Sequence, residues 1–345
     1  MKPMNARELA LKSNPVSVTN YTDGNVHEMY TFNHETTEQT PALTDYRYIG
    51  NDPYNYVYFN CDDLNNQNSE TCEVWRIIGV FDVDDGNGNW ETRIKLVRGS
   101  LLPDDLAWND DGSNDWLNSS LKNYLNNEFY QNLSNQSKNM TNEAKYYLGG
   151  PTIRSKEIGI SIYSYYGSTD QIYEWERGKT LADPTDSANG DCYQTISDYG
   201  YCSLRNFDWN GRIALMYPSD YYYVYDKGVD LNCFNDPTEC SSKEWKYNSE
   251  THMSELVDKE NSSFPETSWI YISDKPDNKT YISSTWLLSP DSKFLGQVFN
   301  TSGAKLSGNY STDSHYPPRP ILYLSSSVKI IDGDGSINNP YKLGF

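Results

Sequence analysis

The chain has 345 residues, enough for one large domain or two of ordinary size. Its 28 Lys and Arg stand against 48 Asp and Glu; the net charge of −20 repels phosphate and argues against nucleic acid as a partner. Aromatic residues make up 14%, with 30 Tyr, so we expect a folded protein with a polar, Tyr-rich surface. No apolar run of about 20 residues occurs and no secretory signal is visible, so we expect no membrane span, and any anchor to be a segment absent from this sequence.

The first part of the chain differs from the rest. Residues 1–44 show little periodicity and predict an extended N-terminal lead-in, while residues 45–345 predict a single domain with insertions. Runs rich in Val, Ile and aromatic residues then predict three strands, with a hairpin turn at the glycines of Asp84–Asn89. These strands are expected at Asn55–Asn60, Glu73–Val83 and Glu91–Arg98.

Helical periodicity follows in Asn114–Leu133, where apolar residues recur at spacings of three and four. Ser119 or Ser120 is the expected N-cap, and a second helix is expected over Gln136–Tyr147. The remainder predicts a helix end at "YEWERG", a strand from Gly211 that breaks at Pro218, a strand at Thr267–Ile272 and short strands in the tail. Helices that come early and strands that return late favour an α+β fold with a mostly antiparallel sheet. Core positions are expected at Trp75, Leu121, Trp286 and Leu324.

Six cysteines fall into three pairs that are local in sequence and enclose polar loops. Disulfides between them would each stabilise the fold by about 2–3 kcal/mol and would indicate an oxidising compartment. Free thiols and a zinc site are the alternatives, although no CxxC spacing occurs and only four His are present. The preferred pairs are Cys61–Cys72, Cys192–Cys202 and Cys233–Cys240.

Signals for catalysis and for cofactors are weak. Asp82, Asp84, Asp85 and Glu91 crowd one hairpin but lack the twelfth-position Glu of a calcium loop, so a solvated turn is the favoured interpretation. No nucleophile elbow, phosphate loop or dinucleotide fingerprint occurs, and the four His offer few partners for a Ser or Cys nucleophile. We therefore expect no enzyme, no catalytic residues, no metal and no cofactor.

Binding chemistry is better represented. Tyr, Ser, Gly and Asn are the residues that recognition loops favour, and Ser219–Asp226 has that composition. Tyr221 and Tyr223 are candidate ligand-binding residues. The alternative is a strand that buries every second Tyr ring in the core.

The order of several motifs resembles a known family. "WRIIGVFDVDDGNGNWETRIKLVR", "DWLNSSLKNYLNNEFY", "GRIALMYPSDYYY", "TWLLSP" and "RPILYLSSSVKIIDGDGSINNPYKL" are similar to exported gut-Firmicutes proteins of the uncharacterised domain family 6273, from about Glu28 onward. Trp286–Pro290 followed by Arg319–Leu324 also resembles the frame of C-type-lectin-like domains, which include the variable proteins of diversity-generating retroelements. Leu288 and Pro318 depart from that frame.

The resemblance implies a C-type-lectin-like fold in which the segment between the framing strands lies on the ligand face. Within this segment, alternation favours Val298 and Leu306 as core contacts. The residues expected to face a ligand are Phe294, Gln297, Phe299, Asn300, Lys305, Asn309 and Tyr310, although a large apolar ring such as that of Phe299 is usually buried.

The sequence thus predicts a secreted or cell-surface ligand-binding or adhesion module, located outside the cell and bound to a protein or a glycan. Two alternatives remain open. One is a structural subunit of a surface assembly or pilus. The other is an enzyme of the formylglycine-generating type, which would need a reactive cysteine.

Overall fold

The structure is a computed structural model. It describes residues 2–12, 16–17, 29–49, 52–150, 169–178, 206–223, 243–248, 253–258, 269–270, 284–291, 296–302 and 305–345.

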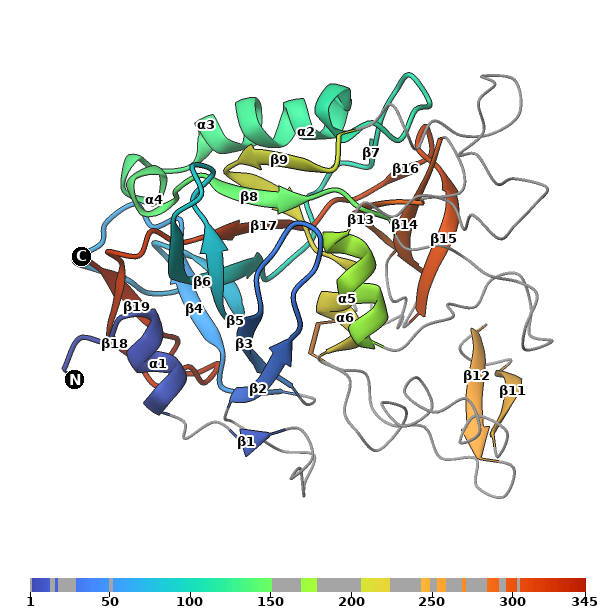
Figure 1. Ribbon diagram of the computed structural model, residues 1–345. Coiled ribbons are helices and arrows are strands. Elements are labelled where there is room, and N and C mark those ends of the chain that lie inside the picture. Colours follow the sequence, from blue (N-terminus) through green and yellow to red (C-terminus); the bar gives the residue numbers. More distant parts are fainter. Residues whose placement is uncertain are drawn as a thin grey trace, which may run out of the picture.

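An eight-stranded sheet forms the centre of the molecule (Figure 1). Its order is β1-β2-β3-β5-β6-β17-β10, and β4 pairs with β5 beside this path. Every pairing is antiparallel except that of β1 with β2. The strands are β1 (Val16–Ser17), β2 (Met29–His34), β3 (Leu43–Tyr48), β4 (Tyr56–Phe59), β5 (Glu73–Asp84), β6 (Trp90–Arg98), β10 (Ile213–Leu215) and β17 (Pro320–Tyr323).

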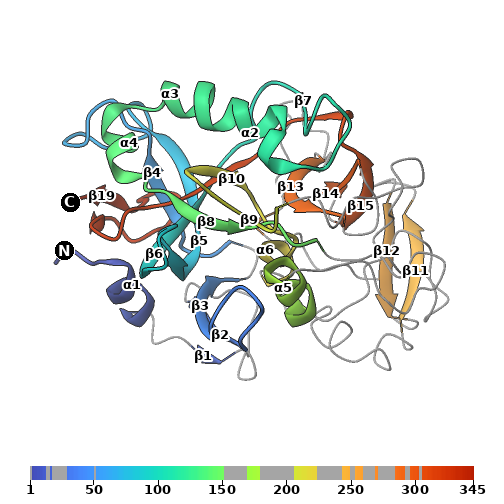
Figure 2. The same ribbon diagram turned by 45° about the horizontal axis from the view of Figure 1, so that its top comes forward.

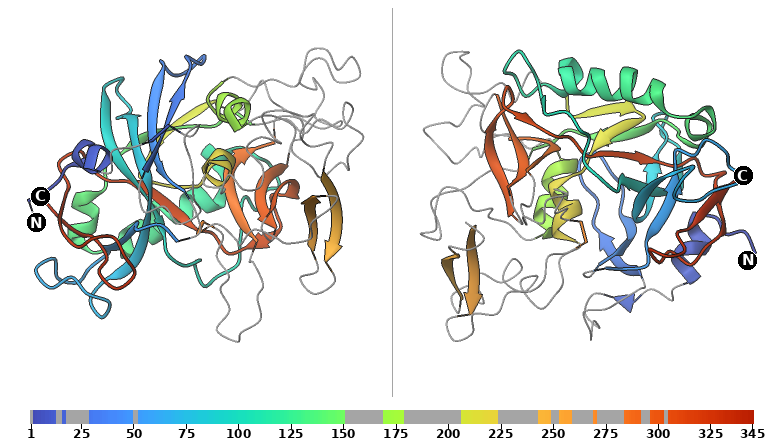
Figure 3. Two further views of the ribbon diagram at one scale, coloured as in Figure 1. Left: turned by 90° about the horizontal axis from the view of Figure 1, so that it is seen from below. Right: turned by 180° about the vertical axis from the view of Figure 1, so that it is seen from behind.

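Smaller sheets surround the central one (Figures 2 and 3). Four are two-stranded: β7 (Leu106–Ala107) with β16 (His315–Tyr316), β8 (Ala144–Tyr147) with β9 (Asp208–Gly211), β11 (Lys243–Asn248) with β12 (Met253–Asp258), and β18 (Lys329–Asp332) with β19 (Lys342–Gly344). A three-stranded sheet contains β13 (Thr285–Pro290), β14 (Gln297–Ser302) and β15 (Lys305–Ser311). The mostly antiparallel sheet with few short helices confirms the predicted fold class at that level.

The helices are short: α1 (Ala6–Lys12), α2 (Ser120–Tyr124), α3 (Tyr130–Asn132), α4 (Asn135–Met140), α5 (Thr169–Arg177) and α6 (Pro218–Tyr222). A 3-10 turn, η2 (Trp116–Asn118), precedes α2, and a π turn, η3 (Leu125–Phe129), joins α2 to α3. This helical run agrees with the periodicity of Asn114–Leu133. The Ser119 hydroxyl accepts from the Lys122 amide, which confirms it as the N-cap.

The lead-in differs from the expected extended segment. Leu9 and Ala10 of α1 are buried in the core, and β2 pairs along its whole length with β3. Met4 forms a bridge with Ile330, so α1 lies beside β18 and β19, close to both termini (Figure 1). Tertiary packing orders these parts of residues 1–44. Sequence periodicity does not predict such packing for so short a helix.

Three further expectations need correction. The segment Gln136–Tyr147 is helical only in α4 and continues as strand β8. The chain does break at Pro218, but Pro218–Tyr222 is a helix and not a strand with alternating Tyr. In Thr267–Ile272 the structure describes only Trp269 and Ile270, which form a turn.

One hydrophobic cluster joins the sheet to the helices. Trp75, Leu121, Trp286 and Leu324 are all buried in it, as predicted. In the part of the chain that the structure describes, no helix has the length and apolar character needed to cross a membrane.

Candidate functional site

The predicted binding segment corresponds to the sheet β13–β14–β15. Strand β13 is buried at all six positions and is tied to the core by hydrogen bonds. The Trp286 indole donates to the Leu106 carbonyl (2.7 Å), and the Trp108 indole donates to the Leu287 carbonyl (3.0 Å). The Leu288 amide donates to the Met216 carbonyl (2.9 Å). The sheet therefore has a rigid inner strand.

The middle strand, β14, is less exposed than expected. Val298 is buried as predicted, but Phe299 and Asn300 are also buried, both at 0% exposure, and Gln297 is partly exposed. Adjacent strand residues point to opposite faces, so both faces of β14 are covered. The expected display of Phe299 and Asn300 is therefore wrong for this structure.

The outer strand, β15, carries the remaining candidates. Lys305, Asn309 and Tyr310 lie on it, and Tyr310 is in register with Val298. A bulge falls between the Val298 and Phe299 pairings. The side-chain positions of these three residues and of Leu306 lie outside what the structure describes, as does Phe294 altogether.

Tyr221 and Tyr223 are not available to an external ligand, because both are buried at 1% exposure. The Tyr223 ring lies 4.6 Å from the Arg47 guanidinium, and its hydroxyl donates to Asp170 (2.6 Å). Tyr221 also packs in the core. The helix that begins at Pro218 turns the Tyr run inward, so these two candidates are corrected to structural positions.

A buried cluster of charges, which no sequence pattern indicated, lies between the sheet and helices α5 and α6. Asp220, on α6, accepts from Lys95 Nζ (2.5 Å) and from Arg47 Nη1 (3.0 Å). Asp45 accepts from Arg47 Nη2 (2.7 Å) and lies 3.0 Å from His34 Nε2. These contacts connect β2, β3, β6 and α6 through groups with almost no exposure to water.

Helix α5 extends the cluster. Glu176 accepts from the Ser219 amide (2.9 Å) and hydroxyl (2.5 Å), and Arg177 Nη1 lies 3.2 Å from Glu176 Oε2. The Tyr173 ring stacks on His34 with a centroid distance of 3.6 Å. The charge cluster thus comprises His34, Asp45, Arg47, Lys95, Glu176, Arg177 and Asp220.

The protonation of the charge cluster follows from burial and pairing. Burial acts to raise the pKa of Asp220, but Lys95 and Arg47 outweigh it and lower the pKa. Asp45 behaves likewise: burial opposes the charges of Arg47 and His34, which hold its pKa well below the usual range. Burial lowers the pKa of Lys95 to about 8, although Asp220 acts to raise it. Burial also raises the pKa of Glu176 to about 7, against the opposing effect of Arg177.

A cavity of about 20 Å³ lies beside the charge cluster, lined in part by Asp45, Lys145, Tyr147 and Arg177. This volume holds about one water molecule and no substrate of ordinary size. Each acid of the cluster is also hydrogen-bonded to a neighbouring group of the protein. The arrangement therefore fixes α5 and α6 to the sheet.

The acidic hairpin uses its carboxylates to shape the turn. Asp84 Oδ1 accepts from the amides of Gly86 (2.8 Å) and Gly88 (2.9 Å), and both glycines have positive φ. The other oxygen of Asp84 lies 3.3 Å from Lys145 Nζ. Among the described residues, no group of three His, Cys, Asp or Glu side chains is placed to hold a metal ion.

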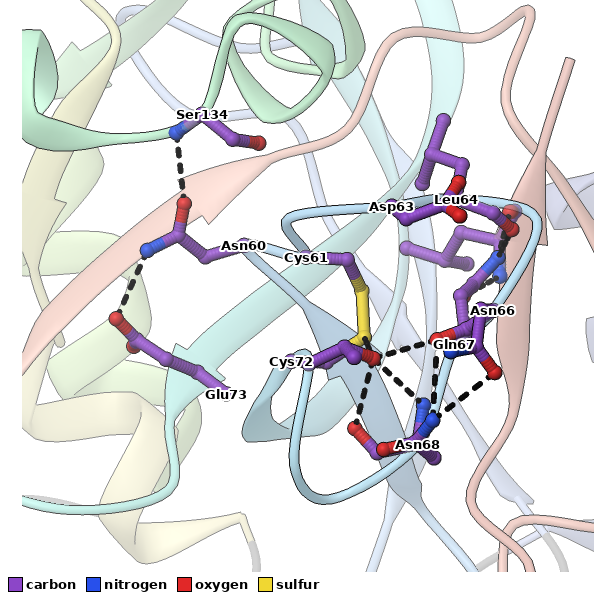
Figure 4. The surroundings of a disulfide bond; sticks show 12 residues. Asn60, Cys61, Asp63, Leu64, Asn66, Gln67, Asn68, Cys72, Glu73 and Ser134 are labelled. Atoms are coloured by element: carbon purple, nitrogen blue, oxygen red, sulfur yellow. Dashed lines mark hydrogen bonds between the residues drawn. A yellow bond between two sulfur atoms is a disulfide. The ribbon is translucent and has the colours of Figure 1, made fainter.

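The first cysteine pair forms the expected disulfide, Cys61–Cys72 (Figure 4). The Asn60 side chain beside it donates to Glu73 (2.9 Å) and accepts from the Ser134 amide (2.8 Å). The loop is thereby joined to β5 and to the start of α4. The other four cysteines lie outside the described residues.

Comparison with known proteins gives no relative: no family model, no curated protein and no solved structure matches this chain.

Proposed function

We propose that this chain is a ligand-binding module that works outside the cell and contacts its ligand through β15 and the start of β14. The observation that carries the proposal is the position of β15 in the sheet β13–β14–β15. The inner strand β13 is buried at every position, and β15, which pairs only with β14 among the described strands, has the polar sequence "KLSGNYS". A polar edge strand on a rigid base suits recognition, because a strand that is already ordered loses little conformational entropy on binding.

One further feature supports the extracellular part of the proposal. The Cys61–Cys72 disulfide is typical of proteins from oxidising compartments. The net charge of −20 bears on the ligand instead, because it disfavours binding to anionic surfaces.

The proposal includes a C-type-lectin-like arrangement. The sheet β13–β14–β15 lies in sequence between β10 and β17, two strands that pair in the central sheet. The resemblance of "TWLLSP" (β13) and "RPILYL" (which includes β17) implies that the segment between these two framing strands, with β14 and β15, faces the ligand. The ligand is proposed to be a protein or a glycan, and the chain is proposed to have no catalytic activity.

The test begins with glycan-array and whole-cell binding by the purified protein. For the target found, Phe294, Asn309 and Tyr310 are replaced by Ala together, and Gln297 and Lys305 by Ala in a second variant. We expect at least a tenfold loss of affinity in the first variant, because a small number of aromatic and polar contacts supply most of the binding energy in most interfaces. The melting temperature should stay unchanged.

A matched control replaces Trp90, Asn65 and Ile337 by Ala, because these are an aromatic, an amide and an apolar residue exposed elsewhere. It should bind like the wild type. Unfolding of the first variant would contradict the proposal, and so would equal loss of binding in the control. Concentration-dependent assembly in light scattering, with no target on array or cells, would favour a structural subunit instead.

A further inference from the structure

Strand β4 and the two residues before it carry three tyrosines on one face. Tyr54, Tyr56 and Tyr58 occupy alternate positions, and the residues between them, Asn55 and Val57, are buried. Tyr54 is 40% exposed, and Tyr56 and Tyr58 are partly exposed. Alternate side chains of a strand stand about 7 Å apart. The three rings therefore form a row at the surface, which we call the tyrosine row.

The backbone under the tyrosine row is held from both sides. Strand β5 pairs with β4 along its whole length, and on the other side the Tyr58 amide donates to the Tyr341 carbonyl (2.9 Å). The Cys61–Cys72 disulfide closes the β4–β5 hairpin at the Tyr58 end. Both edges of β4 are thus occupied, so a partner would contact side chains here and not the backbone.

A contact within the chain shows which chemical group suits the tyrosine row. Arg76 lies opposite Tyr56 on β5, and its Cζ stacks 3.5 Å from the centroid of the Tyr56 ring. Asp52 accepts from the Tyr56 hydroxyl (2.8 Å) and from Arg76 Nη2 (3.2 Å). A guanidinium between an aromatic face and a carboxylate is stabilised by both. The row therefore has the chemistry that binds Arg side chains.

The charges around the tyrosine row are mainly acidic. Asp52 lies at one end with 62% of its side chain exposed, and Asp62, Asp63 and Glu70 are exposed in the disulfide loop at the other end. Arg76, the cation within the row, is already paired with Asp52. The net charge of −20 acts in the same direction. The surface therefore complements a cationic partner and repels an anionic one.

We propose that the tyrosine row is a docking surface for an extended, Arg-bearing segment of a partner protein. Its Arg side chains stack on the exposed faces of Tyr54 and Tyr58 and pair with Asp52 and with the acids of the disulfide loop. An extended peptide also advances about 7 Å every two residues, so Arg at alternate positions matches the spacing of the rings.

This inference does not depend on the proposed function. Strand β4 and the sheet β13–β14–β15 lie apart in the molecule (Figures 1 and 2). The tyrosine row would therefore be a second contact surface, and variants of the two surfaces can be tested separately.

The experiment measures fluorescence anisotropy of a labelled peptide, Arg-Ser-Arg-Ser-Arg, with the full chain. The salt concentration is about 0.15 M, where charges more than about 8 Å apart are largely screened. The same peptide with citrulline in place of Arg keeps the shape and removes the charge. We expect the wild type to bind the Arg peptide about tenfold more tightly than the citrulline peptide. The double variant Tyr54→Ala/Tyr58→Ala and the variant Asp52→Asn should each lose about fivefold in affinity.

The matched controls are Trp90→Ala and Asp332→Asn, because Trp90 is an aromatic residue exposed elsewhere and Asp332 is a surface acid on β18. Both should bind the Arg peptide like the wild type. The proposal is overturned if the wild type does not bind the Arg peptide, if the citrulline peptide binds equally well, or if the tyrosine variant keeps its affinity. Binding of a neutral glycan that requires the two tyrosines, without binding of the Arg peptide, also overturns it.

A measurement on the wild type decides if the tyrosine variant fails to fold. Tyrosines are nitrated with tetranitromethane, with and without the Arg peptide, and the modified positions are identified by mass spectrometry. The bound peptide should protect Tyr54 and Tyr58. Protection of Tyr310 on β15, with none at the tyrosine row, would contradict the inference and would place the peptide on the surface of the proposed function instead.

Discussion

Asp220 accepts hydrogen bonds from Lys95, from Arg47 and from the backbone amide of Tyr217 (2.9 Å), and none of these groups reaches water. A single carboxylate thereby pairs with two cations that belong to two different strands, and Asp45 is the second partner of Arg47. The sequence separation explains why this was not predicted. Lys95 lies 125 residues from Asp220, and a Lys in a strand usually indicates a solvent-facing position.

Asp220→Asn should lower the free energy of unfolding by about 3–5 kcal/mol, because it leaves Lys95 and Arg47 buried without their shared carboxylate. Urea titration measures the change. Asp332→Asn serves as the comparison, since Asp332 pairs with Lys342 at the surface. Its urea midpoint should stay close to that of the wild type. A similar shift of the urea midpoint in both variants would contradict the prediction, because the buried ion pairs would then stabilise the fold no more than the surface pair does.

At the scale of elements, α6 shows where sequence patterns mislead. Pro218 stands at its first position, and the Asp220 side chain accepts from the Tyr217 amide, which is a regular way to begin a helix. The Tyr run that follows favours a strand by propensity. The helix forms nevertheless, because the core buries Tyr221, Tyr222 and Tyr223. No local sequence pattern predicts that burial.

Strand β13 was easier to predict, because three consecutive apolar residues, Trp286–Leu288, lie in it and Trp286 fills the core. Trp286→Ala should cost about 3–5 kcal/mol, since it removes a large buried ring together with the hydrogen bond to Leu106. Thermal and urea unfolding measure this. Trp90→Ala, at a partly exposed hairpin position, should cost less than about 1 kcal/mol. An equal loss of stability in the two variants would contradict the prediction that Trp286 is a core residue.

At the scale of the whole molecule, the sequence predicted an antiparallel α+β fold, the β5–β6 hairpin and the buried frame around β13 and β17. These depend on local periodicity and turn chemistry, which a sequence displays directly. The burial of β14 and the charge cluster depend on contacts between distant segments. Asn300 illustrates the limit: its polar side chain indicated exposure, yet it lies fully buried.

The three predicted disulfides also concern the whole chain. Non-reducing peptide mapping should find Cys61–Cys72, which the structure contains, together with Cys192–Cys202 and Cys233–Cys240. Thiol titration of the denatured, unreduced protein should then detect no free thiol. A link such as Cys72 to Cys192, or two or more free thiols, would contradict the local pairing and would revive an enzymatic interpretation.

The position of β17 has a consequence for biosynthesis. This strand lies between β6 and β10 in the central sheet, although it follows both by more than a hundred residues in the chain. During translation β6 and β10 are synthesised before β17. Each strand keeps an unpaired edge until the C-terminal segment leaves the ribosome. The sheet therefore closes only after nearly the whole chain has been synthesised, and this long-range pairing should make folding slow.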